Sequence, residues 1–347
     1  MRLVSNPFRG GGKLAENAPY PSTDAERVSS LLSKCPSFAE TQLVDARDLA
    51  PVAAFWVKDE RTRMGLGSFK ALGAAYVIAR QAVEQNDRPG SDTLVGRTYV
   101  TASAGNHGLS VAAGAKVFGA KAVIYIADTV PESFADRLRD IGADPVRAGS
   151  DYAASMDAAK RAAEDNGWIL LSDSSWDGYT ELPYILMEGY LQMVAEAVDQ
   201  CPSAPSHIFL QAGVGGLAGA VAAYARKAWG DAPKIIVVEP EAAPALQASV
   251  EEGKCVFADG PDSIMGRLDC KEPSLIALNG LARDADCFLT LTDEEVTAHL
   301  PQMKAADLET TASGGAGIAA AMKPEVRKAL GMTEEARVLC FLSEVTD

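Results

Sequence analysis

The 347-residue chain contains few of the residues from which metal sites and membrane spans are built. It has only three histidines, widely separated, and its six cysteines form no C-x-x-C pair. This pattern argues against a zinc site and against a serine-hydrolase triad, and favours reduced thiols in the cytoplasm. No apolar run reaches 18 residues, and the N-terminus lacks a signal-peptide core. The sequence therefore predicts no transmembrane helix and a cytoplasmic protein.

Positive charge is also scarce. The chain has 32 Lys and Arg against 47 Asp and Glu, which gives a formal net charge of -15. Proteins that bind duplexes or membrane surfaces carry a basic patch, so neither nucleic acid nor a membrane is expected as a partner. A small-molecule substrate is the expected partner instead.

What the chain does have is a regular alternation of short apolar runs with helical stretches. Runs such as AVIYIA (122–127) and IIVVE (235–239) carry apolar residues on both faces, as parallel strands covered by helices must. We expect an α/β protein with two twisted, mostly parallel sheets flanked by helices. The first 25 residues are expected to wrap the surface, and residues 184–200 to form one helix. Residues 75–170 are predicted to form a small domain, inserted in a large domain of residues 1–74 and 171–347.

Lys70 lies in the segment GSFKALGA (67–74), in the first turn of a predicted helix. The positive end of a helix dipole disfavours an ammonium group, so we expect a lowered lysine pKa, which suits a Schiff-base lysine. A solvated surface lysine is the alternative, and the pattern alone does not exclude it.

A glycine-rich segment, QAGVGGLAG (211–219), lies between a predicted strand and an Ala-rich helix. Glycines let the backbone approach an anion closely, and the helix N-terminus supplies N–H donors, so this segment is predicted to bind a phosphate. No Walker lysine follows, which argues against an NTPase. The alternative is a tight turn without a ligand.

A third segment, TASAGNHG (101–108), joins another strand to another helix. Its serine and exposed N–H groups suit a carboxylate, and Asn106 can bond a phenolate or carbonyl oxygen. The alternative is a helix cap with a buried His107. A lysine for an imine, a phosphate turn and a carboxylate turn together indicate a pyridoxal-phosphate enzyme acting on amino acids.

These segments, with DSSWDGYTELP (173–183) and TASGGAG (311–317), resemble the fold-type II pyridoxal-phosphate enzymes, the tryptophan-synthase β-like group. Within that group the chain looks most like the diaminopropionate ammonia-lyases, over roughly residues 40–347. The resemblance implies pyridoxal 5'-phosphate in an interdomain cleft, a homodimer, and α,β-elimination from a β-substituted L-amino acid of the diaminopropionate type. The products would be a 2-oxo acid and ammonia.

The resemblance also implies roles for individual residues. Lys70 would form the Schiff base and act as a catalytic base. Asp173 is expected to bind a β-ammonium group or assist its departure; the alternative is that it caps the next turn. Ser103, Ala104 and Gly105 would hold the substrate carboxylate. The residues implied in cofactor binding are Lys70, Phe69, Asn106 at O3′, Gly213, Val214, Gly215, Gly216 and Gly219 around the phosphate, and Ser313 at the pyridine nitrogen.

One departure from the ammonia-lyases affects the substrate. They carry an aspartate before Gly-Asn-His, which serves as the base for D-substrates, whereas this chain has Ala104. The resulting SAGNHG resembles the serine and threonine dehydratases, so a dehydratase of L-serine, L-threonine or a 3-hydroxy amino acid is an alternative. Two further alternatives are a β-replacement synthase and a catalytically idle cofactor-binding or partner-binding protein. With a single base, an L-preference is expected.

Overall fold

A computed structural model describes residues 1–346 and contains two separate sheets, as expected from the sequence. The larger sheet has the order β1-β10-β9-β8-β11-β3-β2 and the smaller one β6-β5-β4-β7. The larger sheet is formed by β1 (Arg2–Ser5), β2 (Gln42–Asp45), β3 (Ala54–Asp59), β8 (His207–Gln211), β9 (Lys234–Pro240), β10 (Cys287–Leu291) and β11 (Arg337–Leu342). The smaller sheet is formed by β4 (Thr98–Ala102), β5 (Lys121–Ile126), β6 (Asp144–Arg147) and β7 (Ile169–Leu170).

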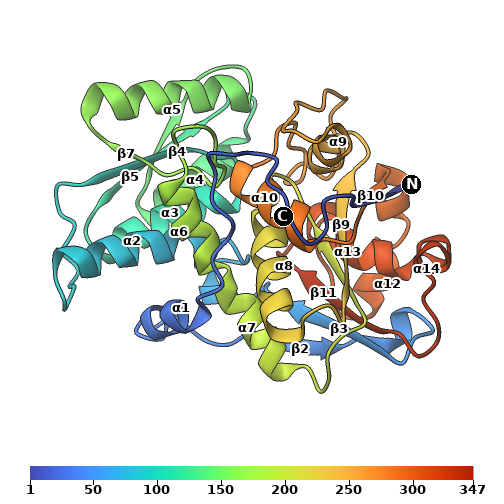
Figure 1. Ribbon diagram of the computed structural model, residues 1–347. Coiled ribbons are helices and arrows are strands. Elements are labelled where there is room, and N and C mark those ends of the chain that lie inside the picture. The colour runs from blue at the N-terminus through green and yellow to red at the C-terminus, as the bar shows by residue number, and fades with distance from the viewer. Residues whose placement is uncertain (347) are drawn as a thin grey trace.

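Helices surround both sheets, which lie in separate halves of the molecule (Figure 1). Residues 1–200 contain α1 (Ala25–Leu32), α2 (Ala71–Gln85), α3 (Asn106–Val117), α4 (Glu132–Ile141), α5 (Tyr152–Asn166), α6 (Glu181–Gly189) and α7 (Leu191–Gln200). Residues 201–346 contain α8 (Gly216–Trp229), α9 (Ala245–Glu252), α10 (Leu275–Asp284), α11 (Asp293–Thr297), α12 (Leu300–Ala305), α13 (Ala312–Met322) and α14 (Pro324–Leu330). None of the helices described in residues 1–346 is long and apolar enough to cross a membrane.

The strands in the middle of the large sheet are apolar because both faces are covered. On β8, Ile208 and Leu210 belong to a hydrophobic cluster that includes α8, whereas Phe209 belongs to a second cluster that includes α13. All three side chains are fully buried. The pairings of β8, β9, β10, β11 and β3 with one another are parallel, so their C-terminal ends share one edge. Helix N-termini gather at that edge, which is where parallel α/β sheets bind ligands.

The N-terminal segment corrects an expectation. Residues 2–5 do not merely wrap the surface, because β1 pairs antiparallel with β10 and extends the large sheet. Asn6 then fixes the segment: its side-chain amide donates to the carbonyls of Ala282 at 2.8 Å and Ala285 at 2.7 Å. These bonds occupy carbonyls at the C-terminal end of α10 that have no partner within the helix.

The smaller sheet lies wholly within residues 98–170. Its strands pair in parallel throughout. It therefore falls inside the small domain predicted from the sequence, while the exact domain boundaries stay a prediction. The α/β fold class with two mostly parallel sheets is confirmed.

The single helix expected over residues 184–200 is interrupted at Tyr190, between α6 and α7. Gly189 lies against α2 there: a Cβ at this position would be 2.4 Å from the Leu72 carbonyl oxygen. The buried Tyr190 ring then meets the Phe69 ring, with centroids 4.9 Å apart. This contact positions the segment immediately before α2, which carries Lys70.

We expect Gly189→Ala to lower the free energy of unfolding by about 2 kcal/mol, because the added methyl group overlaps backbone atoms of α2 that cannot move independently. Urea denaturation measures the change. Gly11→Ala is the matched control, since a Cβ at Gly11 meets no atom within 4 Å; its effect should stay within about 0.5 kcal/mol. Equal stabilities of the two variants would contradict the proposed close approach.

Candidate active site

Lys70 and Asp173 are 103 positions apart in the sequence and in direct contact in the structure. Lys70 immediately precedes α2, and Asp173 follows β7. The Lys70 Nζ donates to Asp173 Oδ2 at 2.6 Å, and the two side chains are only 22% and 19% exposed. The fold thus brings together the two residues that the sequence predicts to be catalytic.

The pKa of Lys70 is raised, not lowered as the sequence predicts. Burial lowers the pKa of Lys70, but the negative charge of Asp173 and the neighbouring Tyr190 hydroxyl more than offset it, and the pKa lies above its ordinary value. Burial raises the pKa of Asp173, yet the charges of Lys70 and His107 hold it below its ordinary value. The lowered Lys70 pKa expected from the helix dipole is therefore wrong, because the carboxylate of Asp173, which belongs to a distant segment, stabilises the ammonium form.

The turn between β4 and α3 has a well-defined internal structure. The Ser103 Oγ accepts from the N–H groups of Gly105 at 3.2 Å and Gly108 at 3.0 Å, so it caps the start of the helix. His107 is buried, with Nε2 2.8 Å from the Leu171 carbonyl oxygen, in keeping with a structural histidine. Ala104 is exposed on the turn. The substrate contacts expected for Ser103, Ala104 and Gly105 stay predictions.

Asn106 contacts a carboxylate that the sequence analysis did not single out. Its side-chain amide donates to Glu344 Oε2 at 2.6 Å. Glu344 is buried, follows β11, and also bonds the Thr311 hydroxyl and the Arg267 guanidinium, the latter at 2.8 Å. The available signal was the polar pair Ser343 and Glu344 after the buried run VLCFL (338–342), because the C-terminal ends of strands in such sheets carry functional side chains.

The glycine segment forms a close-packed turn between β8 and α8. Gly215 has φ of +97°, a conformation that only glycine adopts readily. A Cβ on Gly213 would lie 2.9 Å from Cys270 Sγ, and one on Gly219 would lie 3.1 Å from Met187 Cε. Because its glycines carry no side chains, the turn presents backbone atoms at the N-terminus of α8, a helix of 14 residues. The N–H groups at a helix N-terminus suit a phosphate group.

Two further residues adjoin this turn. Cys270 is a neutral thiol at neutral pH, because burial and then the charge of Asp173 raise its pKa to about 12. Ser313, the second residue of α13, is buried, and its Oγ accepts from the Arg267 N–H at 3.1 Å. Pyridoxal phosphate needs an amine, a phosphate-binding turn and a hydroxyl group. Lys70, the glycine turn and Ser313 supply them, each at the N-terminus of a helix. The residues fit the cofactor, while the individual contacts stay predictions.

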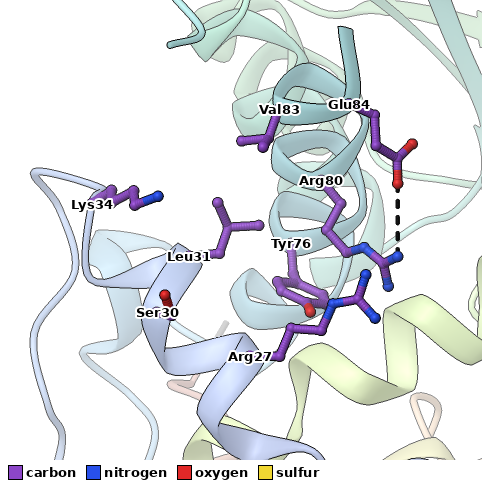
Figure 2. A pocket seen from close by; sticks show the side chains of 8 residues that line it. All are labelled: Arg27, Ser30, Leu31, Lys34, Tyr76, Arg80, Val83 and Glu84. Carbon is purple, nitrogen blue, oxygen red and sulfur yellow. Dashed lines mark ion pairs between the residues drawn. The ribbon is translucent and has the colours of Figure 1, made fainter. Parts of the chain in front are cut away.

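A separate cavity of about 200 Å³ lies between α1 and α2 (Figure 2). None of the predicted site residues lines it. Arg80, one of its lining residues, contacts Glu84 and, at 3.1 Å, the buried Glu188. The full lining is Arg27, Ser30, Leu31, Lys34, Tyr76, Arg80, Val83 and Glu84.

Comparison with known proteins agrees with this site. The model of the family "Pyridoxal-phosphate dependent enzyme" matches residues 35–344. The chain belongs to this family. Diaminopropionate ammonia-lyase of Salmonella typhimurium is 33% identical over 291 residues, 77% of this chain and 72% of that protein. The Escherichia coli enzyme is 31% identical over 312 residues, 84% of this chain and 77% of that protein.

The solved structures agree as well. The holo form of Escherichia coli diaminopropionate ammonia-lyase has a TM-score of 0.88 to this chain at 28% identity, and covers 99% of this chain and 93% of its own. The fold-type II resemblance is therefore confirmed, and the protein is an enzyme whose cofactor is pyridoxal 5'-phosphate.

We expect Gly213→Ala to weaken pyridoxal-phosphate binding about tenfold or more, since the methyl group would push apart the turn and the loop carrying Cys270. Fluorescence titration of the apoprotein measures the affinity. The exposed Gly90→Ala, facing only the flexible Asp92 side chain, is the control and should bind normally. Equal affinities in both variants would show that this turn does not hold the phosphate.

Proposed function

We propose that the protein catalyses α,β-elimination from a β-substituted L-amino acid of the diaminopropionate type, giving a 2-oxo acid and ammonia. The Lys70–Asp173 pair, with 2.6 Å between Nζ and Oδ2, carries this proposal. It places a base and a carboxylate together beside the glycine turn, which is what proton removal and leaving-group departure require. The activities named for the related ammonia-lyases support the same reaction.

When bound, pyridoxal phosphate supplies the aldehyde that binds the amino group and the electron sink for charge at Cα. Lys70 Nζ is the amine that would hold the cofactor and would remove the proton from Cα of the substrate. The Asp173 carboxylate, 2.6 Å from Lys70 Nζ, would bind a β-ammonium group of the substrate and assist its departure.

The remaining residues position the reactants. Ser103, with the N–H groups of Ala104 and Gly105, binds the substrate α-carboxylate, and Phe69 packs beside the cofactor. Asn106, oriented by its bond to Glu344, would bind the cofactor at O3′. Ser313 would bind at the pyridine nitrogen. The residues that would hold the phosphate are Gly213, Val214, Gly215, Gly216 and Gly219.

Asp173→Asn should lower kcat by about 10²-fold or more, because it removes the carboxylate 2.6 Å from the lysine amine. Its loss should also let the Lys70 pKa fall, since Asp173 is the main group raising it. The measurements are ammonia release and the pH dependence of kcat. Asp177→Asn, an exposed aspartate of the same segment, is the control and should retain activity. A fully active Asp173→Asn would remove it from the mechanism.

A preference for L-substrates follows from Ala104, which cannot accept a proton on the face opposite Lys70. Ala104 is exposed at the turn where the α-carboxylate is proposed to bind. We expect kcat/KM for L-2,3-diaminopropionate to exceed that for the D-form by about 10²-fold or more, the usual contribution of a positioned base. Ala104→Asp should raise D-turnover. Comparable rates on both isomers of the unmodified enzyme would contradict the single-base argument.

A second candidate function is dehydration of L-serine, L-threonine or another 3-hydroxy amino acid. The turn SAGNHG (103–108) favours it, because Ala104 replaces the aspartate of the ammonia-lyases and the turn then resembles that of the serine and threonine dehydratases. Assays of 2-oxo acid and ammonia over a panel of β-substituted amino acids separate the two functions. The substituent giving the highest kcat/KM identifies the leaving group, and turnover only with an added second nucleophile would indicate a β-replacement synthase.

Assembly and location are part of the proposal. We infer a homodimer from the family resemblance, and a cytoplasmic location from six cysteines that are all free thiols in the structure. We also propose that residues 1–74 and 171–347 form the large domain and residues 75–170 the small domain. Light scattering of the purified holoenzyme tests the dimer.

A further inference from the structure

The hydroxyl group of Tyr190 is buried and has no hydrogen-bond partner in the part of the chain that the structure describes. Tyr190 lies between α6 and α7 and is only 1% exposed. Burial raises its pKa to about 12, so the hydroxyl is neutral at neutral pH and can donate a hydrogen bond. A buried polar group that makes no hydrogen bond destabilises a folded protein, and for that reason such groups are rare in native structures.

The end of the ring that carries this hydroxyl lies between the first turns of two helices. Tyr190 Cε1 lies 2.7 Å from the position that a Cβ would take on Gly73, in the first turn of α2. On the other side, Cε2 lies 3.3 Å from the corresponding position on Gly216, the first residue of α8, whereas Cδ2 lies 4.0 Å from it. The two Cε atoms flank the carbon that bears the hydroxyl. The hydroxyl end of the ring therefore adjoins both the start of α2 and the glycine turn before α8.

The groups on either side of the hydroxyl are those proposed to bind one cofactor. Lys70 immediately precedes α2, and its Nζ lies 5.7 Å from the centre of the Tyr190 ring. This amine donates its hydrogen bond to Asp173. Pyridoxal phosphate carries its aldehyde and its phosphate arm on adjacent ring carbons, so a cofactor joined to Lys70 places its phosphate arm close to the lysine. The hydroxyl of Tyr190 lies between the lysine and the turn that suits the phosphate.

We propose that Tyr190 is an additional cofactor-binding residue whose hydroxyl donates a hydrogen bond to the phosphate group of pyridoxal phosphate. The proposal rests on the proposed function in one respect, because it takes the glycine turn at Gly216 as the phosphate site. Phosphate oxygens are charged acceptors, and a hydrogen bond to a charged acceptor is about twice as strong as one between neutral groups. Because the hydroxyl has no partner within the chain, the tyrosine contributes to cofactor affinity rather than to the stability of the chain alone.

Tyr190→Phe tests the proposal, since it removes the hydroxyl and keeps the ring that contacts Phe69 and Gly216. The full-length apoprotein is titrated, with fluorescence detection, with pyridoxal phosphate and with pyridoxal, which lacks the phosphate. The variant should bind pyridoxal phosphate about tenfold or more weakly, as expected for one lost bond to a charged group. Its affinity for pyridoxal should equal that of the unmodified protein. An unchanged affinity for pyridoxal phosphate, or an equal loss for both ligands, would overturn the proposal.

Tyr99→Phe is the matched control. Tyr99 is also fully buried, but its hydroxyl donates to Gln81 Oε1 at 2.6 Å, so both affinities should be unchanged in this variant. Urea denaturation of the apoproteins gives a second measurement. Tyr99→Phe should lower the urea midpoint because it removes a hydrogen bond, whereas Tyr190→Phe should not. A lowered midpoint for Tyr190→Phe would overturn the proposal, since it would show that the hydroxyl is bonded within the chain.

Failure of this inference and failure of the proposed function give different results. Normal cofactor binding by Tyr190→Phe, together with weak binding by Gly213→Ala, would overturn the role of the tyrosine and leave the phosphate site in place. Binding requires no turnover. A loss specific to pyridoxal phosphate in Tyr190→Phe, in a protein without elimination activity, would support the inference and contradict the proposed function instead.

Discussion

The ion pair between Lys70 and Asp173 is the interaction on which the site depends. It joins Lys70, at the start of α2, to Asp173, in the segment that follows β7 of the smaller sheet. Two partly buried opposite charges stabilise each other's ionised forms, which is why the lysine pKa is raised and the aspartate pKa lowered. Removing either partner leaves the other charge poorly solvated, so binding the cofactor through the lysine changes the aspartate's environment directly.

The packing of α6 and Tyr190 against the N-terminal end of α2 fixes the position of Lys70. Gly189 lets α6 approach the first turn of α2, and the interruption at Tyr190 brings its ring onto Phe69, the residue before the lysine. The same Tyr190 ring lies against the first residue of α8, where a Cβ on Gly216 would be 3.3 Å away. One aromatic side chain thus contacts both the lysine segment and the glycine turn, and keeps their spacing constant.

A second set of polar groups lies on the other side of the site. Glu344 binds Asn106 and Arg267, and its backbone carbonyl accepts from the Thr310 hydroxyl at 2.6 Å. The end of β11 is therefore connected to the start of α3 and to the loop before α10. The carboxylate that orients Asn106 therefore also holds the Arg267 guanidinium.

Much of this architecture was predictable from the sequence because its signals are local. The strand and helix pattern, the glycine turn and the lysine at a helix start all depend on neighbouring residues, and the structure places them as expected. The raised pKa of Lys70, the roles of Glu344 and Arg267, and the break at Tyr190 depend on contacts between distant segments. The strand at residues 2–5 was missed for the same reason, since only its pairing with β10 makes it a strand.

The central claim is that Lys70 holds the cofactor at this pair. Borohydride reduction of the holoenzyme, followed by peptide mapping by mass spectrometry, tests it most directly. The account predicts that the reduced pyridoxyl group is found on the peptide containing Lys70 and on no other lysine. Recovery of the group on a different lysine, or an unmodified Lys70 in a cofactor-loaded enzyme, would contradict it.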